Sequence, residues 1–148
     1  MKLQKLISKL EKHHKKKLDL SLGRTFNLLK KLGNPQDKLK NVVTVVGTNA
    51  KASMCYSLKS ILNQAGYKCN LYTSPHLLSY TERYVFEDKE INEDNLIELL
   101  IDVEKTLGDD NATLFEILTC AFLKHAENFR DNINIILKIF SIFNKCAC

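Results

Sequence analysis

The sequence lacks a long uninterrupted hydrophobic run, although 45% of its 148 residues are hydrophobic. No segment approaches the ~18 apolar residues that a transmembrane helix requires, so we expect no membrane partner. The first twenty residues alternate Leu and Ile with Lys and lack the apolar core and cleavage site of a secretory signal. These absences predict a globular protein located in the cytoplasm.

Cysteines and histidines are few and form no recognisable disulfide framework or zinc site. The five cysteines are an odd number, and Cys55, Cys69 and Cys120 lie inside apolar segments, which indicates reduced thiols. Cys146 and Cys148 form one C-x-C pair without partner ligands, which is a weak metal signal. The four histidines lack the spacing of zinc ligands.

Positive charge is concentrated at the N-terminus. Residues 1–40 contain twelve Lys and Arg against three Asp and Glu, whereas the whole chain has a net charge of +5. A basic arm can bind nucleic acid or an anionic membrane surface. We favour a solvated helix face instead, because the first apolar residues, Leu3, Leu6, Ile7 and Leu10, have helical spacing with lysines between them. No aromatic residues interleave with these lysines, so a nucleic-acid partner is not expected.

Hydrophobic periodicity and helix-end signals predict an α/β order of elements. Helices are expected at 3–17, 21–32, 51–65, 92–107 and 113–129, and strands at 42–46, 67–73 and 133–137. The strand at 42–46 is apolar on both faces, which is typical of a buried parallel strand. The order predicts a parallel sheet with helices on both faces, where ligands bind at the carboxyl ends of the strands. Residues 47–53 and 73–76 fall at those ends.

The stretch "GTNAKAS" at 47–53 connects a predicted strand to a predicted helix. Such a turn offers backbone N–H groups and a helix N-terminus to an anion, with Lys51 reaching phosphate oxygens and Thr48 or Ser53 assisting. The pattern G-x-x-x-x-G-K-[ST] is not met, because Val45 and Ala50 stand at its two glycine positions and Ala52 stands at its Ser/Thr position. The alternative is an ordinary strand-to-helix turn with a solvated lysine.

Two further segments contain candidate functional residues. "YTSPHLLSYTER" at 72–83 leaves a strand and presents Ser74, Pro75 and His76. "TLFEILT" at 113–119 places Glu116 among apolar residues, which is unfavourable unless the carboxylate is paired or metal-bound. The alternative for Glu116 is a surface position near a helix N-terminus, where the helix dipole favours an acid.

Together these segments resemble the N-terminal part of the folylpolyglutamate synthase/dihydrofolate synthase family, within the Mur ligase superfamily. Four stretches match in order: "LGNPQDKLK" at 32–40, "VVGTNAKAS" at 45–53, "AGYKCNLYTSPHLLSYTER" at 65–83 and "TLFEILTCAFL" at 113–123. The resemblance implies a three-layer P-loop-type parallel sheet with flanking helices. It also implies that residues 1–148 form a partial ATP-binding domain, truncated before the sheet is complete and lacking the glutamate-binding C-terminal domain.

The resemblance further implies an ATP- and Mg²⁺-dependent ligase, expected as a monomer, that joins L-glutamate to a pteroate or folate. Residues are assigned by motif: ATP phosphates at Gly47, Thr48, Asn49, Lys51 and Ser53; Mg²⁺ at Ser74 and Glu116; and the folate side at Thr73, Pro75, His76 and Arg83. Hard oxygen donors such as a serine hydroxyl and a carboxylate are the ligands that Mg²⁺ prefers.

Two departures from the family lead us to expect weak or no activity. The family loop reads G-T-N-G-K-G-S, so Ala50 and Ala52 each add a Cβ, with strain of about 1 kcal/mol wherever φ must be positive. After 133–137 the chain continues as "KIFSIFNKCAC", which does not match the family. The alternative functions are a non-catalytic α/β pseudoenzyme or binding module with a degenerate phosphate loop, and a basic-arm nucleic-acid binder.

Overall fold

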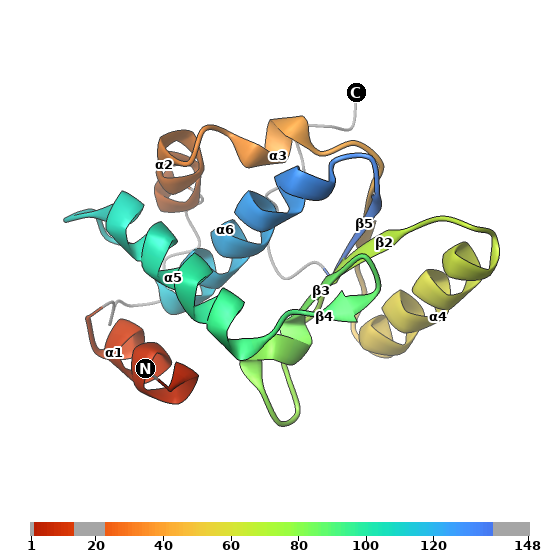
Figure 1. The fold of residues 1–148 in the computed structure, drawn as a ribbon, viewed down its shortest axis with the longest axis horizontal. Helices are drawn as coiled ribbons and strands as arrows, with labels where there is room; N and C mark the ends of the chain where they lie inside the picture. The colour runs from red at the N-terminus through yellow and green to blue at the C-terminus, as the bar shows by residue number, and fades with distance from the viewer. Residues whose placement is uncertain (1, 14–22, 138–148) are drawn as a thin grey trace. The chain divides into compact units, whose positions relative to one another are not determined.

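The computed structural model describes residues 2–13 and 23–137 (Figure 1). The chain divides into two compact units. The helical unit comprises Met1–Lys38 and Asn92–Asn128, and the sheet unit comprises Leu39–Ile91 and Phe129–Cys148, each within the described ranges. Each unit therefore combines two stretches of chain that are distant in sequence.

Helix α6 is the centre of the helical unit. The helices described there are α1 (Leu3–His13), α2 (Gly23–Lys31), α3 (Pro35–Lys38), α5 (Glu93–Leu107) and α6 (Leu114–Ala126). The other four all contact α6 (Figure 1). Residues 117–123 of α6 are all buried. A helix that is apolar on nearly every side needs such cover on every side.

Helix α1 turns its apolar stripe inward. Leu3, Leu6, Ile7 and Leu10 are at most 6% exposed. On the other face Lys9 is half exposed, and its Nζ lies 3.2 Å from Glu104 Oε1 on α5. The predicted amphipathic helix is therefore confirmed over Leu3–His13. Residues 14–17 of the helix predicted at 3–17, and residues 21–22 of the helix predicted at 21–32, lie outside the described part of the chain.

Helix α5 begins and ends where the sequence predicts. The Asn92 side chain accepts a hydrogen bond from the Asn95 N–H at 2.8 Å, which is a standard N-cap. Gly108 follows the last turn with φ +62°, a conformation that favours glycine. The helix predicted at 113–129 is α6 at Leu114–Ala126, and it is followed by a short 3-10 helix, η2 (Glu127–Phe129).

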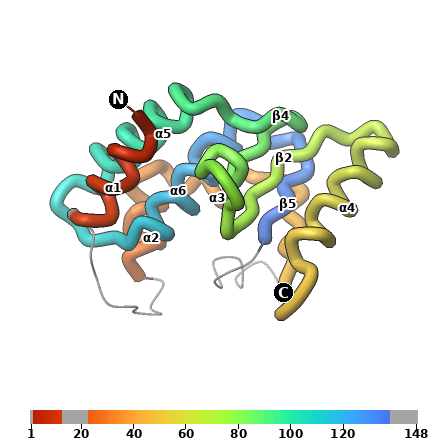
Figure 2. Tube along the Cα trace, turned by 90° about the horizontal axis from the view of Figure 1, so that it is seen from below, coloured from red at the N-terminus to blue at the C-terminus, as the bar shows by residue number. Residues whose placement is uncertain are grey.

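The sheet unit contains a mixed sheet with the order β1-β5-β2-β3-β4. Its strands are β1 (Val42–Val45), β2 (Cys69–Tyr72), β3 (Tyr84–Phe86), β4 (Lys89–Glu90) and β5 (Ile133–Leu137), with a 3-10 helix, η1 (Tyr80–Arg83), before β3. β5 pairs in parallel with both β1 and β2. Helix α4 (Lys51–Gln64) packs against β1, β5 and β2 and lies beside them (Figure 2).

Two buried asparagines join the neighbouring strands β2 and β5. Asn70 and Asn134 are fully buried and directly opposite in the register, and Asn70 Nδ2 donates to Asn134 Oδ1 at 2.9 Å. The remaining groups are also used: Asn70 Oδ1 accepts from Glu87 N at 3.1 Å, and Asn134 Nδ2 donates to the Lys40 carbonyl at 3.2 Å. Since buried polar groups must be paired, this network stabilises one register of the central pair.

The α/β class with a mostly parallel sheet and helices beside it is confirmed, but the antiparallel hairpin β3–β4 was not predicted. Its turn is formed by Glu87 and Asp88, with φ of +47° and +68°. Two positive φ values define the tight hairpin turns that Asn-Gly usually forms. Because Glu-Asp stands there instead, the usual turn signal is missing from the sequence.

The prediction that 42–46 is buried on both faces is wrong. Val45 is buried, but Val43 is 36% exposed and Val46, beyond the strand, is 64% exposed. Among the described strands, β1 lies at one end of the sheet and has a single neighbour, β5. An end strand has fewer covering side chains than a central one, so its apolar residues remain partly exposed.

Candidate functional site

The loop between β1 and α4 combines a glycine and an alanine with unusual backbone conformations. Gly47 has φ +154° and Ala50 has φ +57°, the left-handed region. Ala50 is the N-cap of α4, and its carbonyl accepts the first helical hydrogen bond from Met54 N at 2.9 Å. The expected strain is therefore present at Ala50. Ala52 lies in the first turn of α4 with helical backbone, so strain is not present there.

The predicted phosphate residues gather at the N-terminus of α4. Thr48, Asn49 and Ser53 are exposed and Lys51 is half-buried. Lys51 Nζ donates to the Thr48 carbonyl at 2.9 Å, so the ammonium group folds back over the loop. Ala50 has no side-chain oxygen to cap α4, which leaves the first-turn N–H groups to another acceptor. The helix dipole makes an anion a favourable acceptor.

The turn after β2 is organised by Arg83. Its Nε donates to His76 Nδ1 at 2.9 Å and its Nη1 donates to Ser74 Oγ at 3.2 Å. The guanidinium also lies over the Tyr80 ring, 4.9 Å from the centroid, and Arg83 is only 9% exposed. The Thr73 N–H donates to the Arg83 carbonyl at 3.2 Å. The structure therefore brings together the predicted residues of this turn.

His76 accepts a hydrogen bond at Nδ1, which requires the neutral imidazole with its proton on Nε2. Burial, together with the positive charge of Arg83, lowers the pKa of His76, while Glu82 acts weakly in the opposite direction. The geometry and the charge thus favour the same protonation state. The exposed neighbour Pro75 follows Ser74 through a cis peptide bond.

Glu82 holds the tip of the same turn and was not identified from the sequence. Its carboxylate accepts the backbone N–H groups of Leu77, Leu78 and Ser79, each at 2.7 Å. These hydrogen bonds, chiefly those from Leu77 and Ser79, lower the pKa of Glu82. The S-x-x-E spacing of a capping box was the available signal. The side chains of Leu77 and Leu78 remain 91% and 93% exposed.

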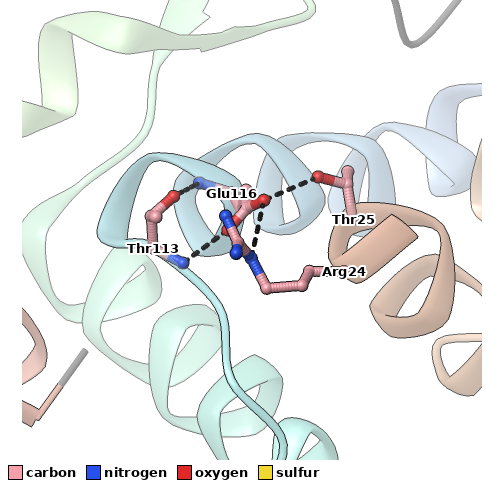
Figure 3. A network of polar contacts seen from close by, with 4 residues as sticks. All are labelled: Arg24, Thr25, Thr113 and Glu116. Atoms are coloured by element: carbon pink, nitrogen blue, oxygen red, sulfur yellow. Dashed lines mark hydrogen bonds and ion pairs between the residues drawn. The ribbon is translucent and has the colours of Figure 1, made fainter. Parts of the chain in front are cut away.

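Glu116 is paired within the helical unit (Figure 3). Its Oε2 accepts the Thr113 N–H at 2.5 Å and its Oε1 accepts the Thr25 hydroxyl at 3.3 Å. Arg24 Nε lies 3.4 Å from each of the two oxygens. The Glu116 N–H donates to Thr113 Oγ1 at 3.2 Å, which completes a capping box for α6. An acid that requires pairing is thus paired, and it sits at a helix N-terminus.

Arg24 and Thr25 were not predicted as partners of Glu116. The T-x-x-E spacing of 113–116 is a recognisable capping box, but no local pattern connects α2 to α6 across about ninety residues of sequence. The two predicted Mg²⁺ ligands, Ser74 and Glu116, lie in different units. Within residues 2–13 and 23–137, no cluster of three or more His, Cys, Asp or Glu could hold a metal.

The cysteines in the described ranges are free thiols. Cys55, Cys69 and Cys120 are buried, and burial raises the pKa of all three. Cys146 and Cys148 lie beyond the described residues. Among the helices that the structure describes, none has the length and hydrophobicity to cross a membrane.

Comparison with known proteins gives consistent matches in sequence and in structure. No protein-family model matches the chain. The dihydrofolate synthase/folylpolyglutamate synthase of Escherichia coli strain K12 is 39% identical over 117 residues, which cover 79% of this chain and 28% of that protein. The chain therefore spans less than a third of the length of this curated relative.

The solved structures that are similar to the chain include two with bound nucleotide. E. coli FolC in complex with DHPP and ADP matches with a TM-score of 0.85 and 35% identity, covering 93% of this chain and 33% of that one. The bifunctional folylpolyglutamate synthase/dihydrofolate synthase of Yersinia pestis, complexed with AMPPNP and a Mn ion, matches with a TM-score of 0.84 and 30% identity, covering 93% and 33%.

Proposed function

Because the chain belongs to the folylpolyglutamate synthase/dihydrofolate synthase family as a partial sequence, we propose that it forms the nucleotide-binding part of an ATP-dependent ligase. The reaction would join L-glutamate to a pteroate or folate. The observation that carries this proposal is the β1–α4 loop, in which the N-terminus of α4 has no side-chain cap and the Lys51 ammonium lies over the loop, 2.9 Å from the Thr48 carbonyl. We also propose a cytoplasmic location, a monomeric state and no nucleic-acid partner.

In this proposal the ATP phosphates lie at the loop 47–53. The first-turn N–H groups of α4 and the Lys51 ammonium hold the phosphate oxygens, and Thr48, Asn49 and Ser53 add polar contacts. Lys51 exchanges the Thr48 carbonyl for a phosphate oxygen, which is the stronger, charge-assisted hydrogen bond. Gly47 allows the chain to turn into the loop at a φ that other residues rarely adopt.

The proposed chemistry has two steps. The γ-phosphoryl group of ATP passes to the substrate carboxylate, and ADP leaves. The amino group of L-glutamate then attacks the acyl phosphate, so that an amide forms while inorganic phosphate and a proton are released. Positioning and electrostatic stabilisation supply most of the rate of phosphoryl transfer; here that contribution is assigned to Lys51 and the α4 N-terminus.

We propose Ser74 and Glu116, each considered within its own unit, as candidate ligands of Mg²⁺. Ser74 Oγ accepts one hydrogen bond, from Arg83, and keeps a second lone pair. The Glu116 carboxylate has two oxygens and is 12% exposed. These hard donors fit Mg²⁺, which binds through one or two protein oxygens together with phosphate and water. When bound, the ion supplies positive charge to the transferring phosphoryl group.

The folate side is assigned to the turn at 73–83. Thr73 and Arg83 are buried and hold the turn in place through the hydrogen bonds described above. Pro75 and His76 are less buried and offer an apolar ring and a neutral imidazole to the substrate. We therefore propose direct substrate contact for Pro75 and His76, and support of the turn for Thr73 and Arg83.

Nucleotide binding by the 148-residue chain tests the proposal. Titration calorimetry and thermal unfolding with AMPPNP and Mg²⁺ are expected to show binding and a higher melting temperature, because a ligand that binds only the native state stabilises it. Lys51→Ala is expected to weaken binding about tenfold or more. Lys105→Ala removes an exposed lysine on α5 and is the matched control.

Restoring the glycines provides a second arm of the same experiment. The double variant Ala50→Gly with Ala52→Gly is expected to bind AMPPNP more tightly, since two Cβ atoms leave the loop. No thermal shift at millimolar nucleotide, in the native chain and in the double variant, would overturn the proposal. That result would favour the second candidate, a non-catalytic α/β binding module whose phosphate loop has degenerated at Ala50.

A further inference from the structure

Arg83 is a buried cation in the turn after β2. Within residues 2–13 and 23–137 it is the one charged residue that is buried, with 9% of its surface exposed. A guanidinium keeps its positive charge in proteins, because its pKa lies above 12. Burial of a charge is unfavourable unless the charge is paired, so a partner of opposite charge is expected beside Arg83.

The described partners of Arg83 are all neutral. Its Nε donates to His76 Nδ1, its Nη1 donates to Ser74 Oγ, and its guanidinium lies over the Tyr80 ring. The neighbouring acid, Glu82, directs its carboxylate to backbone N–H groups of the turn instead. The described residues therefore leave the positive charge of Arg83 without a counter-ion.

The guanidinium also has hydrogen-bond donors to spare. It carries five N–H groups in a planar fork, and the two hydrogen bonds to His76 and Ser74 use two of them. The remaining donors match the two oxygens of a carboxylate. Ser74, His76 and Tyr80 are each partly exposed, so the surroundings of the guanidinium are not closed off from solvent.

The neighbouring side chains favour an aromatic carboxylate over a phosphate. The rings of His76 and Tyr80 lie 4.1 Å apart between centroids, and the exposed Pro75 adds an apolar surface; such groups suit a flat aromatic ring. A terminal phosphate carries nearly two negative charges, whereas Arg83 is the only Lys or Arg between Cys69 and Asp88. One guanidinium balances one carboxylate.

We infer that Arg83 binds the carboxylate of the pteroate or folate substrate through the free N–H groups of its guanidinium. The inference rests on the proposed function, which assigns the folate side to this turn. It adds a direct substrate contact to the supporting role of Arg83. Binding of the carboxylate would also pair the buried charge, so the ligand is expected to stabilise the turn.

Binding of pteroate and of its neutral carboxamide to the 148-residue chain, measured by titration calorimetry, tests this inference. The native chain is expected to bind pteroate about tenfold more tightly than the carboxamide. Arg83→Gln removes the charge and is expected to abolish this preference. Arg130→Gln removes an exposed arginine of the same unit and is expected to keep it.

The ratio of the two affinities separates substrate contact from mere support of the turn. A turn that is only damaged weakens both ligands alike and leaves their ratio unchanged. Equal affinity of the native chain for the two ligands would therefore overturn the inference, as would a preference for pteroate that survives in Arg83→Gln.

NMR of the ¹⁵N-labelled native chain provides a test that does not depend on a variant. The Arg83 Nε–H resonance is expected to shift on addition of pteroate and not on addition of the carboxamide. A shift with AMPPNP or inorganic phosphate in place of pteroate would assign the guanidinium to phosphate and overturn the inference. If the native chain binds neither pteroate nor the carboxamide while AMPPNP still raises its melting temperature, the folate assignment and this inference fall, and the nucleotide proposal stands.

Discussion

Ala50 and Ala52 both replace a glycine of the family loop, but they differ in backbone conformation. Ala50 occupies a left-handed backbone conformation at φ +57°, where a Cβ is strained by about 1 kcal/mol or more. Two residues later Ala52 lies in regular helix, where alanine is the best helix former. The same replacement of glycine by alanine therefore has opposite physical effects at the two positions.

Glycine substitution is expected to separate the two alanines. Ala50→Gly is expected to raise the free energy of unfolding by up to about 1 kcal/mol, because the strain is relieved. Ala52→Gly is expected to lower it by about 0.5 kcal/mol, because glycine is a poor helix former. Urea unfolding of the two single variants measures both effects. A change of the same sign in both would contradict the assigned backbone conformations.

His76 is expected to titrate below the ordinary histidine value of 6.5, because burial and Arg83 lower its pKa. Its contribution to stability is complete above about pH 6.5 and is lost as the pH falls through the lowered folded-state pKa. Arg83→Met removes the positive charge, so the pKa of His76 is expected to rise in an NMR titration. His125, whose pKa is lowered by burial alone, is the internal control and is expected not to move.

At the scale of elements, the long helices were predictable, whereas the short helix α3 and the β3–β4 hairpin were not. Asn92 and Gly108 are local signals that determine the ends of α5 whatever the rest of the chain does. The turn of β3–β4 forms at Glu87 and Asp88 because tertiary pairing overrides a weak local preference. The position of β5 between β1 and β2 depends on contacts between distant segments, which local periodicity does not encode.

The buried asparagine pair is expected to be important for the central strands. Asn70→Ala would leave the Glu87 N–H without its acceptor and the Asn134 Oδ1 without its donor. A buried group left unpaired costs about 1–3 kcal/mol, so a loss of about 2 kcal/mol is expected in urea unfolding. Asn111→Ala, at an exposed position, is the control and is expected to change stability little. Equal effects of the two would argue against the network.

At the scale of the whole molecule, the predicted site divides between two units. The phosphate loop and the 73–83 turn lie in the sheet unit, and Glu116 lies in the helical unit. The sequence predicted the phosphate loop, the 73–83 turn and Glu116 as site segments because each lies in a short, contiguous motif. The partner of Glu116 could not be predicted, since Arg24 reaches it only through the packing of α2 on α6.

The chain covers 28% of its E. coli relative, so we expect it to bind nucleotide without completing the reaction. With ATP, Mg²⁺, a pteroate or folate substrate and radiolabelled L-glutamate, the 148-residue chain is expected to incorporate no label above background. The same preparation is expected to show the AMPPNP-dependent thermal shift, which demonstrates that it is folded. Incorporation of label that Lys51→Ala abolishes would contradict this expectation.

The hydrogen bonds that Glu82 accepts from backbone N–H groups have a consequence for amide exchange in the turn. Leu77 and Leu78 have side chains that are over 90% exposed, yet their N–H groups are held by the Glu82 carboxylate at 2.7 Å. Their amide hydrogens are therefore expected to exchange slowly with deuterated solvent, and Glu82→Gln is expected to accelerate that exchange. A ligand that reaches these leucines would meet a backbone that is already ordered, and would not lose affinity in ordering it.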